Sequence, residues 1–383
     1  MQLSTTPAAQ LTAAAPSTAS AEPTGFFYHQ PYTASPPRAP HYFLRPQAGP
    51  GLASREFQGR MAGVGESLRA ARVATLFLVH GSFAAFDSQN VLTALARRYT
   101  KARGALRRLA VQLMTADVHD AGNYTPHYAE AFQTGLDGRG RGPTVRLVSW
   151  SSENHHLGRA DAAVRLIDEL AALELPAGER ALFWGHSHAG NVFALMSQLL
   201  SADAGAVERF FKAAEVYYRW PMTPLVDVPV WRRVRQLLSH NRQRLAARPC
   251  DWVTFGTPIR YGWKLREGDG LLHFIHHRPD ATRPAYLAPS PTRIEDALHG
   301  ASGDYLQQVG IAGTDTPPSP LVWRSWLANR GLGHLFEHDS RGDLAQQLEI
   351  GARVPDCGTT LLVDYGDCHG TPAEHLAGHA VYT

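Results

Sequence analysis

Residues 180–200 decide the fold class and read RALFWGHSHAGNVFALMSQLL. Their first part, 180–187, is a largely apolar run of strand length, which is typical of a strand buried on both faces of a sheet. Their second part, 189–200, is apolar on almost every side and therefore predicts a buried helix. A strand that turns directly into a buried helix is the building unit of α/β proteins with a parallel sheet.

The same alternation extends to both sides of this stretch. Apolar runs of strand length occur at 73–81 (VATLFLVHG), 144–150 (TVRLVSW), 251–258 (DWVTFGTP), 271–277 (LLHFIHH) and 359–366 (TTLLVDYG). Before residue 180, the segment 157–173 carries apolar side chains at helical spacing. The pattern predicts an α/β fold with a mostly parallel sheet flanked by helices.

Length and composition predict the domain organisation. The chain has 383 residues, and we expect one large α/β domain with insertions over 51–383. Residues 1–50 are rich in Ala, Pro, Ser and Thr, and such a segment buries too little apolar surface to offset its ordering entropy, so we expect a disordered tail. Two stretches, 201–249 and 279–358, interrupt the alternation, and we interpret the aromatic part of the first, 215–232, as a cap over an apolar pocket.

Charge and hydropathy exclude several classes of partner. Lys and Arg number 37 against 34 Asp and Glu, so the net charge of +3 indicates no nucleic-acid partner. The basic clusters at 95–109 and 231–245 are interpreted as solvated faces of amphipathic helices. The chain has no run of 18 apolar residues and therefore no predicted transmembrane segment. Oligomeric state stays open.

The three cysteines, Cys250, Cys357 and Cys368, form no CxxC pair and no disulfide framework. The N-terminal residues lack a basic start and a continuous apolar stretch, so they do not resemble a secretory signal. A reducing compartment fits both observations, and we expect a cytoplasmic protein.

The turn inside 180–200 carries the main catalytic signal. It reads GHSHAG, with Ser187 at its centre, Gly185 two residues before it and Ala189 two residues after it. A sharp turn between strand and helix exposes a serine hydroxyl, and small flanking residues let the two elements pack around a strained backbone. Ala189 departs from the G-x-S-x-G pattern, although Gly190 follows it. The turn predicts a nucleophile at Ser187.

Four segments resemble the α/β-hydrolase superfamily, in particular its lipases and esterases. They are LFLVHGSFA (76–84), WSSENHHLGR (150–159), FWGHSHAGN (183–191) and WVTFGTPIRYGW (252–263), and they occur in the order typical of that family. The resemblance covers roughly residues 73–277. It implies the α/β-hydrolase fold and a serine hydrolase that cleaves a carboxylic ester without a cofactor. The expected substrate is a small acyl ester, with hydrophobic acyl groups favoured by the aromatic insertion.

The same resemblance implies the groups that stabilise the reaction's oxyanion. Acyl transfer passes through a tetrahedral oxyanion, which preorganised N–H groups stabilise by about 3 kcal/mol each. One expected donor is the backbone N–H of His188, directly after the nucleophile. The other is expected in the loop after the strand at 73–81, from Ser82 or Phe83.

A serine nucleophile also requires a base and an acid that orients it. The resemblance implies a histidine after the last strand, and GHAVYT (378–383) favours His379, with His375 as the alternate. The expected acid is Asp304, in the glycine-flanked loop GASGDYLQQVGIAG. Asp280 is the next candidate, and Asp315 and Asp364, the latter inside a predicted strand, remain alternatives.

The remaining histidines do not predict a metal site. The chain has 19 histidines, among them the pairs 155–156 and 276–277 and the two that flank Ser187. Neighbouring side chains in a strand point to opposite faces, so such a pair offers one ligand at most.

Two alternatives to an esterase stay open: an acyltransferase or thioesterase with the same three residues, and a catalytically silent hydrolase fold that serves as a binding protein.

Overall fold

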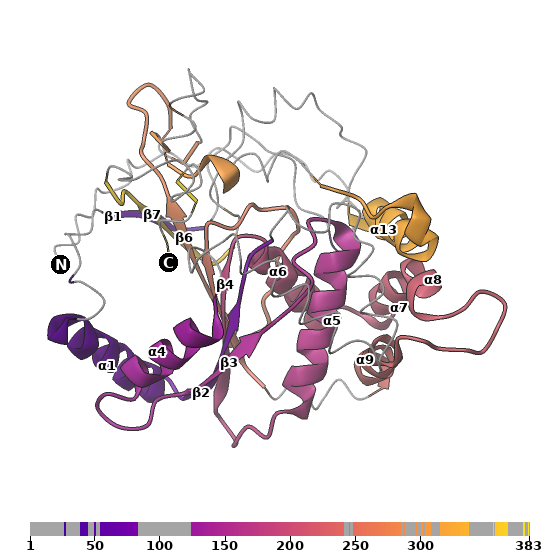
Figure 1. The fold of residues 1–383 in the computed structure, drawn as a ribbon, viewed down its shortest axis with the longest axis horizontal. Helices are drawn as coiled ribbons and strands as arrows, with labels where there is room; N and C mark the ends of the chain where they lie inside the picture. Colours follow the sequence, from indigo (N-terminus) through magenta and orange to yellow (C-terminus); the bar gives the residue numbers. More distant parts are fainter. Residues whose placement is uncertain are drawn as a thin grey trace, which may run out of the picture.

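A seven-stranded, all-parallel sheet forms the centre of the computed structural model of the chain (Figure 1). Its strand order is β1-β7-β6-β5-β4-β2-β3. The strands are β1 His41–Leu44, β2 Val73–Val79, β3 Thr144–Val148, β4 Arg180–His186, β5 Cys250–Phe255, β6 Gly270–His276 and β7 Thr359–Val363. The structure describes residues 27, 39–44, 50, 54–82, 124–240, 245, 248–284, 286–287, 296, 300–301, 303–307, 315–336, 355, 357–366, 378–379 and 382.

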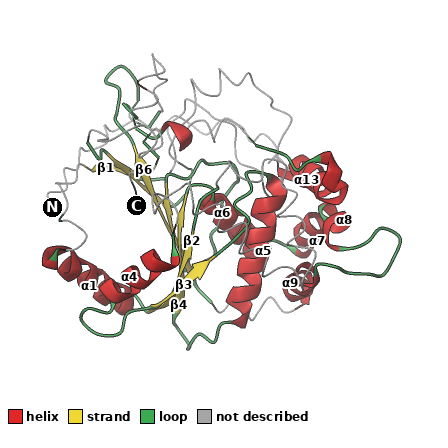
Figure 2. Ribbon diagram, in the orientation of Figure 1, coloured by secondary structure: helices red, strands yellow, loops and turns green. Residues whose placement is uncertain are grey.

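Helices cover both faces of the sheet (Figure 2). Alternate side chains of β2 enter different clusters: Phe77 and Val79 pack on the side of α5 (His156–Ala172) and α6 (Ala189–Ser201), whereas Leu76 and Leu78 face the opposite side. That opposite side is covered by α1 (Arg55–Ala70) and α4 (Pro126–Leu136). A strand buried on both faces needs apolar residues in succession, which explains the continuous run in its sequence. The predicted α/β class with a parallel sheet is confirmed.

An outer layer of helices packs against α5 on the side away from the sheet (Figure 1). It contains α7 (Ala204–Ala213), α8 (Glu215–Tyr218), α9 (Pro229–His240) and α13 (Trp323–Phe336), the last preceded by the short 3-10 turn η1 (Pro320–Val322). The Trp231 side chain is the centre of this layer, stacked on Phe210 and Tyr218. The Trp231 indole and the Tyr217 hydroxyl both donate to one oxygen of Asp161 in α5.

These contacts change the interpretation of the aromatic insertion at 215–232. Three of its four aromatic side chains, Tyr217, Tyr218 and Trp231, are buried against the outer side of α5. They extend the core, so the expectation that they cap a pocket is wrong. Residues 231–240 of the basic segment 231–245 lie in α9. Arg233 and Arg235 form ion pairs with Asp168 and Glu208, as expected of a solvated helix face. The other basic segment, 95–109, lies outside the described residues.

Two further expectations need correction. Strand β1 and the buried ring of Phe27 lie within the predicted disordered tail 1–50, so that prediction is wrong for these residues. Phe27 packs on Phe210 and Phe336, and β1 pairs with β7. Tertiary contacts outweigh the low local apolar content there. Helix α13 likewise lies in 279–358, the second stretch that interrupts the predicted alternation of strands and helices.

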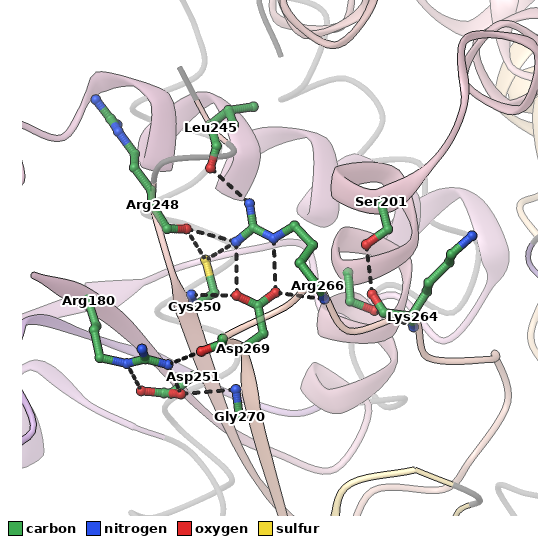
Figure 3. Close-up of polar contacts among 12 residues, drawn as sticks. Arg180, Ser201, Leu245, Arg248, Cys250, Asp251, Lys264, Arg266, Asp269 and Gly270 are labelled. Atoms are coloured by element: carbon green, nitrogen blue, oxygen red, sulfur yellow. Dashed lines mark hydrogen bonds and ion pairs between the residues drawn. The ribbon is translucent and has the colours of Figure 1, made fainter. Parts of the chain in front are cut away.

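Ion pairs hold together the edge of the sheet at which the central strands begin (Figure 3). Arg180 at the start of β4 makes a bidentate pair with Asp251 at the start of β5, with both distances 2.6 Å. Next to them, Arg266 pairs with Asp269 and donates to the Cys250 sulfur. Burial raises the pKa of the Cys250 thiol to about 12. This thiol therefore stays protonated and is no nucleophile at neutral pH.

The opposite edge of the sheet collects the carboxyl ends of all strands. The chain runs from β2 outward to β3, returns past β2 to β4, and then continues to β5, β6 and β7. The direction of strand addition therefore reverses between β2 and β4. In open α/β sheets, ligands bind outside the carboxyl ends of the strands at such a reversal point. Residues that follow β2 and β4 are thus the first to consider for a functional site.

Candidate active site

Ser187 lies at this reversal point, in the two-residue turn between β4 and α6. Its φ angle is +54°, which is rare for a residue with a side chain. Three hydrogen bonds hold this backbone conformation: the Ser187 amide donates to the Phe255 carbonyl at 2.8 Å, and the Ser187 carbonyl accepts from the Gly190 amide and from the Thr257 hydroxyl. Strain that the surroundings fix in this way is frequent at functional sites.

The packing around the turn requires small residues, as the sequence predicted. A Cβ atom on Gly185 would lie 2.5 Å from the Phe193 ring, and one on Gly190 would lie 2.2 Å from the Thr257 hydroxyl oxygen. Gly190 therefore fulfils the steric role that the G-x-S-x-G pattern gives to the position of Ala189. This explains why alanine is accommodated at 189.

The loop after β2 approaches the same turn. A Cβ atom on Gly81 would lie 2.7 Å from the Cβ of Ser187, so the backbone of this loop contacts the serine directly. The Ser82 hydroxyl is buried and has no hydrogen-bond partner among the described residues. Phe83, the other expected oxyanion residue from this loop, lies outside the described residues. His188 begins α6 as its N-cap residue, directly after the serine.

His379 and Asp304 lie in direct contact. The Nδ1 atom of His379 is 2.7 Å from Oδ2 of Asp304, and both side chains are buried. Asp304 Oδ2 also accepts from the Tyr382 hydroxyl at 2.9 Å, and Oδ1 accepts from the Gln307 amide at 2.8 Å. Burial, together with the charge of Asp304, raises the pKa of Tyr382 well above its usual value, so this hydroxyl stays a donor. The carboxylate is thus held by three donors and fixes the His379 ring.

His379 reaches the serine turn through His186. The two rings lie 4.5 Å apart between centroids, and Nε2 of His186 is 2.9 Å from the His379 carbonyl oxygen. The Ser187 hydroxyl itself makes no hydrogen bond with the described residues, and 7% of the Ser187 surface is exposed. The structure therefore brings together Ser187, Gly81, His188, His379 and Asp304 at one edge of the sheet.

The alternative acids lie elsewhere. Asp280 is half-buried and accepts from the Thr282 amide and hydroxyl, as a turn residue does. Asp364 follows β7 instead of lying inside it, and it pairs with Arg278. Asp315 binds arginines. His375 lies outside the described residues.

A buried ionic cluster, which no sequence motif indicated, adjoins the residue after the serine. Arg159 in α5 makes a bidentate pair with Asp315, with both distances 2.8 Å. Arg260 and His156 lie 3.4 Å and 3.3 Å from the same carboxylate. Burial opposes the charge of Asp315, but the two arginines outweigh it and lower the pKa of this carboxyl far below its usual value.

The cluster fixes the state of the His188 ring. His188 Nδ1 lies 3.0 Å from the Asn191 amide nitrogen and 3.5 Å from an Arg159 nitrogen. The Asn191 orientation is set because its nitrogen also donates to the Pro258 carbonyl and its oxygen accepts from the Arg260 amide. Both neighbours of Nδ1 are donors, so the ring carries its proton on Nε2. Burial first, and then the charge of Arg159, lower the pKa of His188 well below its usual value.

A second buried serine and histidine support the loop after β2. The Ser152 hydroxyl lies 3.1 Å from Nδ1 of His80, and Ser152 has a φ angle of +59°. The Trp150 indole donates to the His80 carbonyl at 2.7 Å and stacks on the His80 ring. These contacts fix the backbone that leads to Gly81. Sequence reasoning missed them because Ser152 has no recognisable motif of its own.

The two histidines of the pair 155–156 bind different partners. His155 caps α5 by accepting from the Gly158 amide, and His156 binds the Tyr261 hydroxyl. Among the described residues, no group of three or more His, Cys, Asp or Glu side chains is arranged to hold a metal ion. None of the described helices is both long enough and apolar enough to cross a bilayer.

Comparison of the chain with protein-family models finds no match, and neither a curated protein nor a solved structure matches it. The geometry of the site itself is therefore what indicates a function.

Proposed function

We propose that the chain has the α/β-hydrolase fold and is a serine hydrolase that cleaves carboxylic esters through an acyl-enzyme on Ser187. One observation carries the proposal: the contact of 2.7 Å between His379 Nδ1 and Asp304 Oδ2, at the edge of the sheet where Ser187 occupies a strained turn. An imidazole oriented by a buried carboxylate beside a serine is the arrangement that acyl transfer requires. The position of Ser187 and Gly81 at the topological reversal point supports it.

Each side chain has a defined role in the proposed mechanism. Ser187 Oγ attacks the ester carbonyl while Nε2 of His379 takes its proton, and Asp304 stabilises the imidazolium through Nδ1–H. The backbone N–H groups of His188 and of Ser82 or Phe83 bind the oxyanion. The tetrahedral intermediate then breaks its bond to the alcohol oxygen, which receives the proton from His379. Water attacks the acyl-enzyme in the same way, releasing the carboxylic acid and restoring Ser187.

The buried polar surroundings support this division of roles. The neutral, double-anchored ring of His188 keeps a second cation away from His379, so His379 remains the group that gains charge during the reaction. The Tyr382 hydroxyl donates to one oxygen of Asp304 and the Gln307 backbone amide donates to the other, so the carboxylate is held in place. Since the aromatic insertion packs on α5, the proposal names a carboxylic ester without a preference for hydrophobic acyl groups.

Hydrolysis of p-nitrophenyl esters of increasing acyl length tests the proposal. We expect turnover by the wild type, its loss in Ser187→Ala, and full activity in the matched control Ser67→Ala, an exposed serine on α1. Equal rates for wild type and Ser187→Ala contradict the proposal, and no turnover by a folded wild type favours the silent binding protein. Product analysis with an added alcohol or an acyl thioester separates a hydrolase from an acyltransferase or thioesterase.

A further inference from the structure

A hairpin projects from the outer helical layer, away from the sheet (Figure 1). It connects α8 to α9, and Arg219 and Val226 pair across its base in antiparallel fashion. All seven residues of 219–225, RWPMTPL, are exposed. Trp220, Met222 and Leu225 are its large apolar side chains, and Met222 is as exposed as in an extended peptide, at 104%. These three apolar side chains are not part of the protein's own core.

The hairpin is held in shape from below. The Trp220 amide donates to the Leu225 carbonyl at 3.0 Å, and the Asp227 amide donates to the Tyr218 carbonyl at 3.1 Å. The buried side chain of Arg324 in α13 pairs with both oxygens of Asp227 and lies 4.4 Å above the Trp220 ring. Met222 has a φ angle of +59°, a conformation that is rare for a residue with a side chain. The backbone conformation of the hairpin therefore keeps these side chains exposed.

The exposed face of α13 adds apolar surface beside the hairpin. Leu321 just before the helix, and Trp323 and Leu327 one turn apart on it, are exposed. They adjoin the hairpin because Arg324, next to Trp323, reaches Trp220 and Asp227. We call these six exposed side chains the apolar tip; they are Trp220, Met222, Leu225, Leu321, Trp323 and Leu327. Several large apolar side chains exposed on one layer of a monomer are typical of an interaction site.

Positive charge is concentrated around the apolar tip. Segments 204–240 and 320–336, which form the outer layer, contain eight Lys and Arg against three Asp and Glu, a net charge of +5. The whole chain has a net charge of only +3, so the remainder carries −2. Arg232 on α9 is exposed and makes no ion pair within the described parts of the chain. The hairpin thus belongs to a layer of helices that carries a net positive charge.

We infer that the apolar tip docks the protein on an anionic lipid surface. A convex tip of Trp, Met and Leu enters a deformable bilayer interface, where indole rings are favoured, whereas protein partners require a complementary concave surface. The surrounding arginines attract anionic headgroups, and this attraction weakens with salt. A nucleic acid would use the same charge but would gain nothing from Met222 and Leu225. The inference does not depend on catalysis by Ser187.

Vesicle sedimentation with the full chain tests the inference. We expect the wild type to sediment with vesicles of phosphatidylcholine and phosphatidylglycerol, and far less with phosphatidylcholine alone or at high salt. The variant Met222→Ser/Leu225→Ser should lose about tenfold or more in affinity. Its melting temperature should be unchanged, since both side chains are exposed. The matched control Val64→Ser, an exposed apolar residue on α1, should bind as the wild type does.

Two results overturn the inference. One is a wild type that does not sediment with anionic vesicles. This result also counts against the inference if the basic layer binds nucleic acid or a second copy of the chain. The other is unchanged binding by Met222→Ser/Leu225→Ser. Ser187→Ala should bind vesicles as the wild type does, so a failure of the ester-hydrolysis proposal and a failure of this inference give different patterns.

Discussion

Nδ1 of His379 lies 2.7 Å from Oδ2 of Asp304, and this contact joins residues that are 75 positions apart in the chain. The contact forms at the carboxyl edge of the sheet. It depends on the folded chain and not on the local sequence around either residue. The buried carboxylate also accepts from the Tyr382 hydroxyl and from the Gln307 backbone amide, and these bonds fix its orientation. The His379 ring is then held with Nε2 as the available basic atom.

Removing the charge of Asp304 should therefore impair catalysis more than folding. In Asp304→Asn, the side chain keeps its volume but no longer stabilises an imidazolium, so kcat should fall by about 10²- to 10⁴-fold. Ester turnover, measured together with the melting temperature, checks this. Tyr382→Phe removes one donor to the same oxygen and leaves the charge, so it should lose far less. A folded Asp304→Asn with wild-type kcat contradicts the role given to the acid.

The strained serine turn should not accept a larger residue at Gly190. In Gly190→Ala, the new Cβ would lie 2.2 Å from the Thr257 hydroxyl oxygen, so helix α6 must shift. Overpacking of this kind costs about 1–3 kcal/mol of unfolding free energy, and the shift moves Ser187. Denaturant unfolding and ester turnover measure the two effects. The clash is specific to one side chain, so Gly190→Ala in a Thr257→Ala background should cost less than in the wild type. Equal costs in both backgrounds contradict this account.

The pair of Arg159 and Asp315 should contribute to stability in a pH-dependent way. Asp315→Asn leaves the buried Arg159 without its bidentate partner, which should reduce the unfolding free energy by about 3–5 kcal/mol at neutral pH. The pKa of Asp315 is lower in the folded than in the unfolded chain, so its contribution is complete above the unfolded value near 4. It is lost as the pH falls further. The difference in unfolding free energy between the two proteins should therefore stay constant from pH 7 to about pH 5 and begin to narrow as the pH falls below 4, and a difference that does not narrow there would contradict the prediction.

His273 predicts a second pH dependence. It lies inside the sheet on β6, 2.6 Å from the Thr254 hydroxyl, and burial lowers its pKa from 6.5 to about 3. Below pH 6.5 the unfolded chain therefore binds a proton that the folded chain does not. Stability should fall by up to about 1.4 kcal/mol per pH unit between pH 6.5 and 3 from this group alone.

Replacement of His273 tests this dependence. In His273→Gln the part of the slope due to this side chain should disappear, while His127→Gln, an exposed histidine on α4, should keep the wild-type slope. Guanidinium unfolding at several pH values gives the slopes. An identical slope in wild type and His273→Gln contradicts a buried, neutral His273.

The central strands and helices of the fold follow from local sequence, whereas its edges do not. Strands β2 and β4 and helix α6 are continuous apolar runs because both of their sides are buried, and such runs are visible in the sequence. Strand β1 has only four residues at the edge of the sheet, and its pairing with β7 determines it. Helix α13 contains two glycines and depends on distant partners, such as the bond from the Leu157 amide to Asn329.

One part of the candidate site also follows from local sequence, and another part does not. The turn at Ser187 has a local pattern, because strand, turn and helix are consecutive in the chain. The cluster of Arg159 and Asp315 has none, since its members are 156 residues apart and an isolated charged residue is normally on the surface. Tyr382 was likewise invisible as a partner of Asp304, because only the folded chain brings the two together.

Covalent labelling of the serine tests the central claim most directly. A fluorophosphonate probe should form one adduct, and peptide mass spectrometry should locate it on Ser187. The adduct should be absent in Ser187→Ala and form much more slowly in His379→Ala, with both variants folded. Labelling of another serine, equal labelling of the wild type and Ser187→Ala, or no labelling of the folded wild type would contradict a nucleophile at this turn.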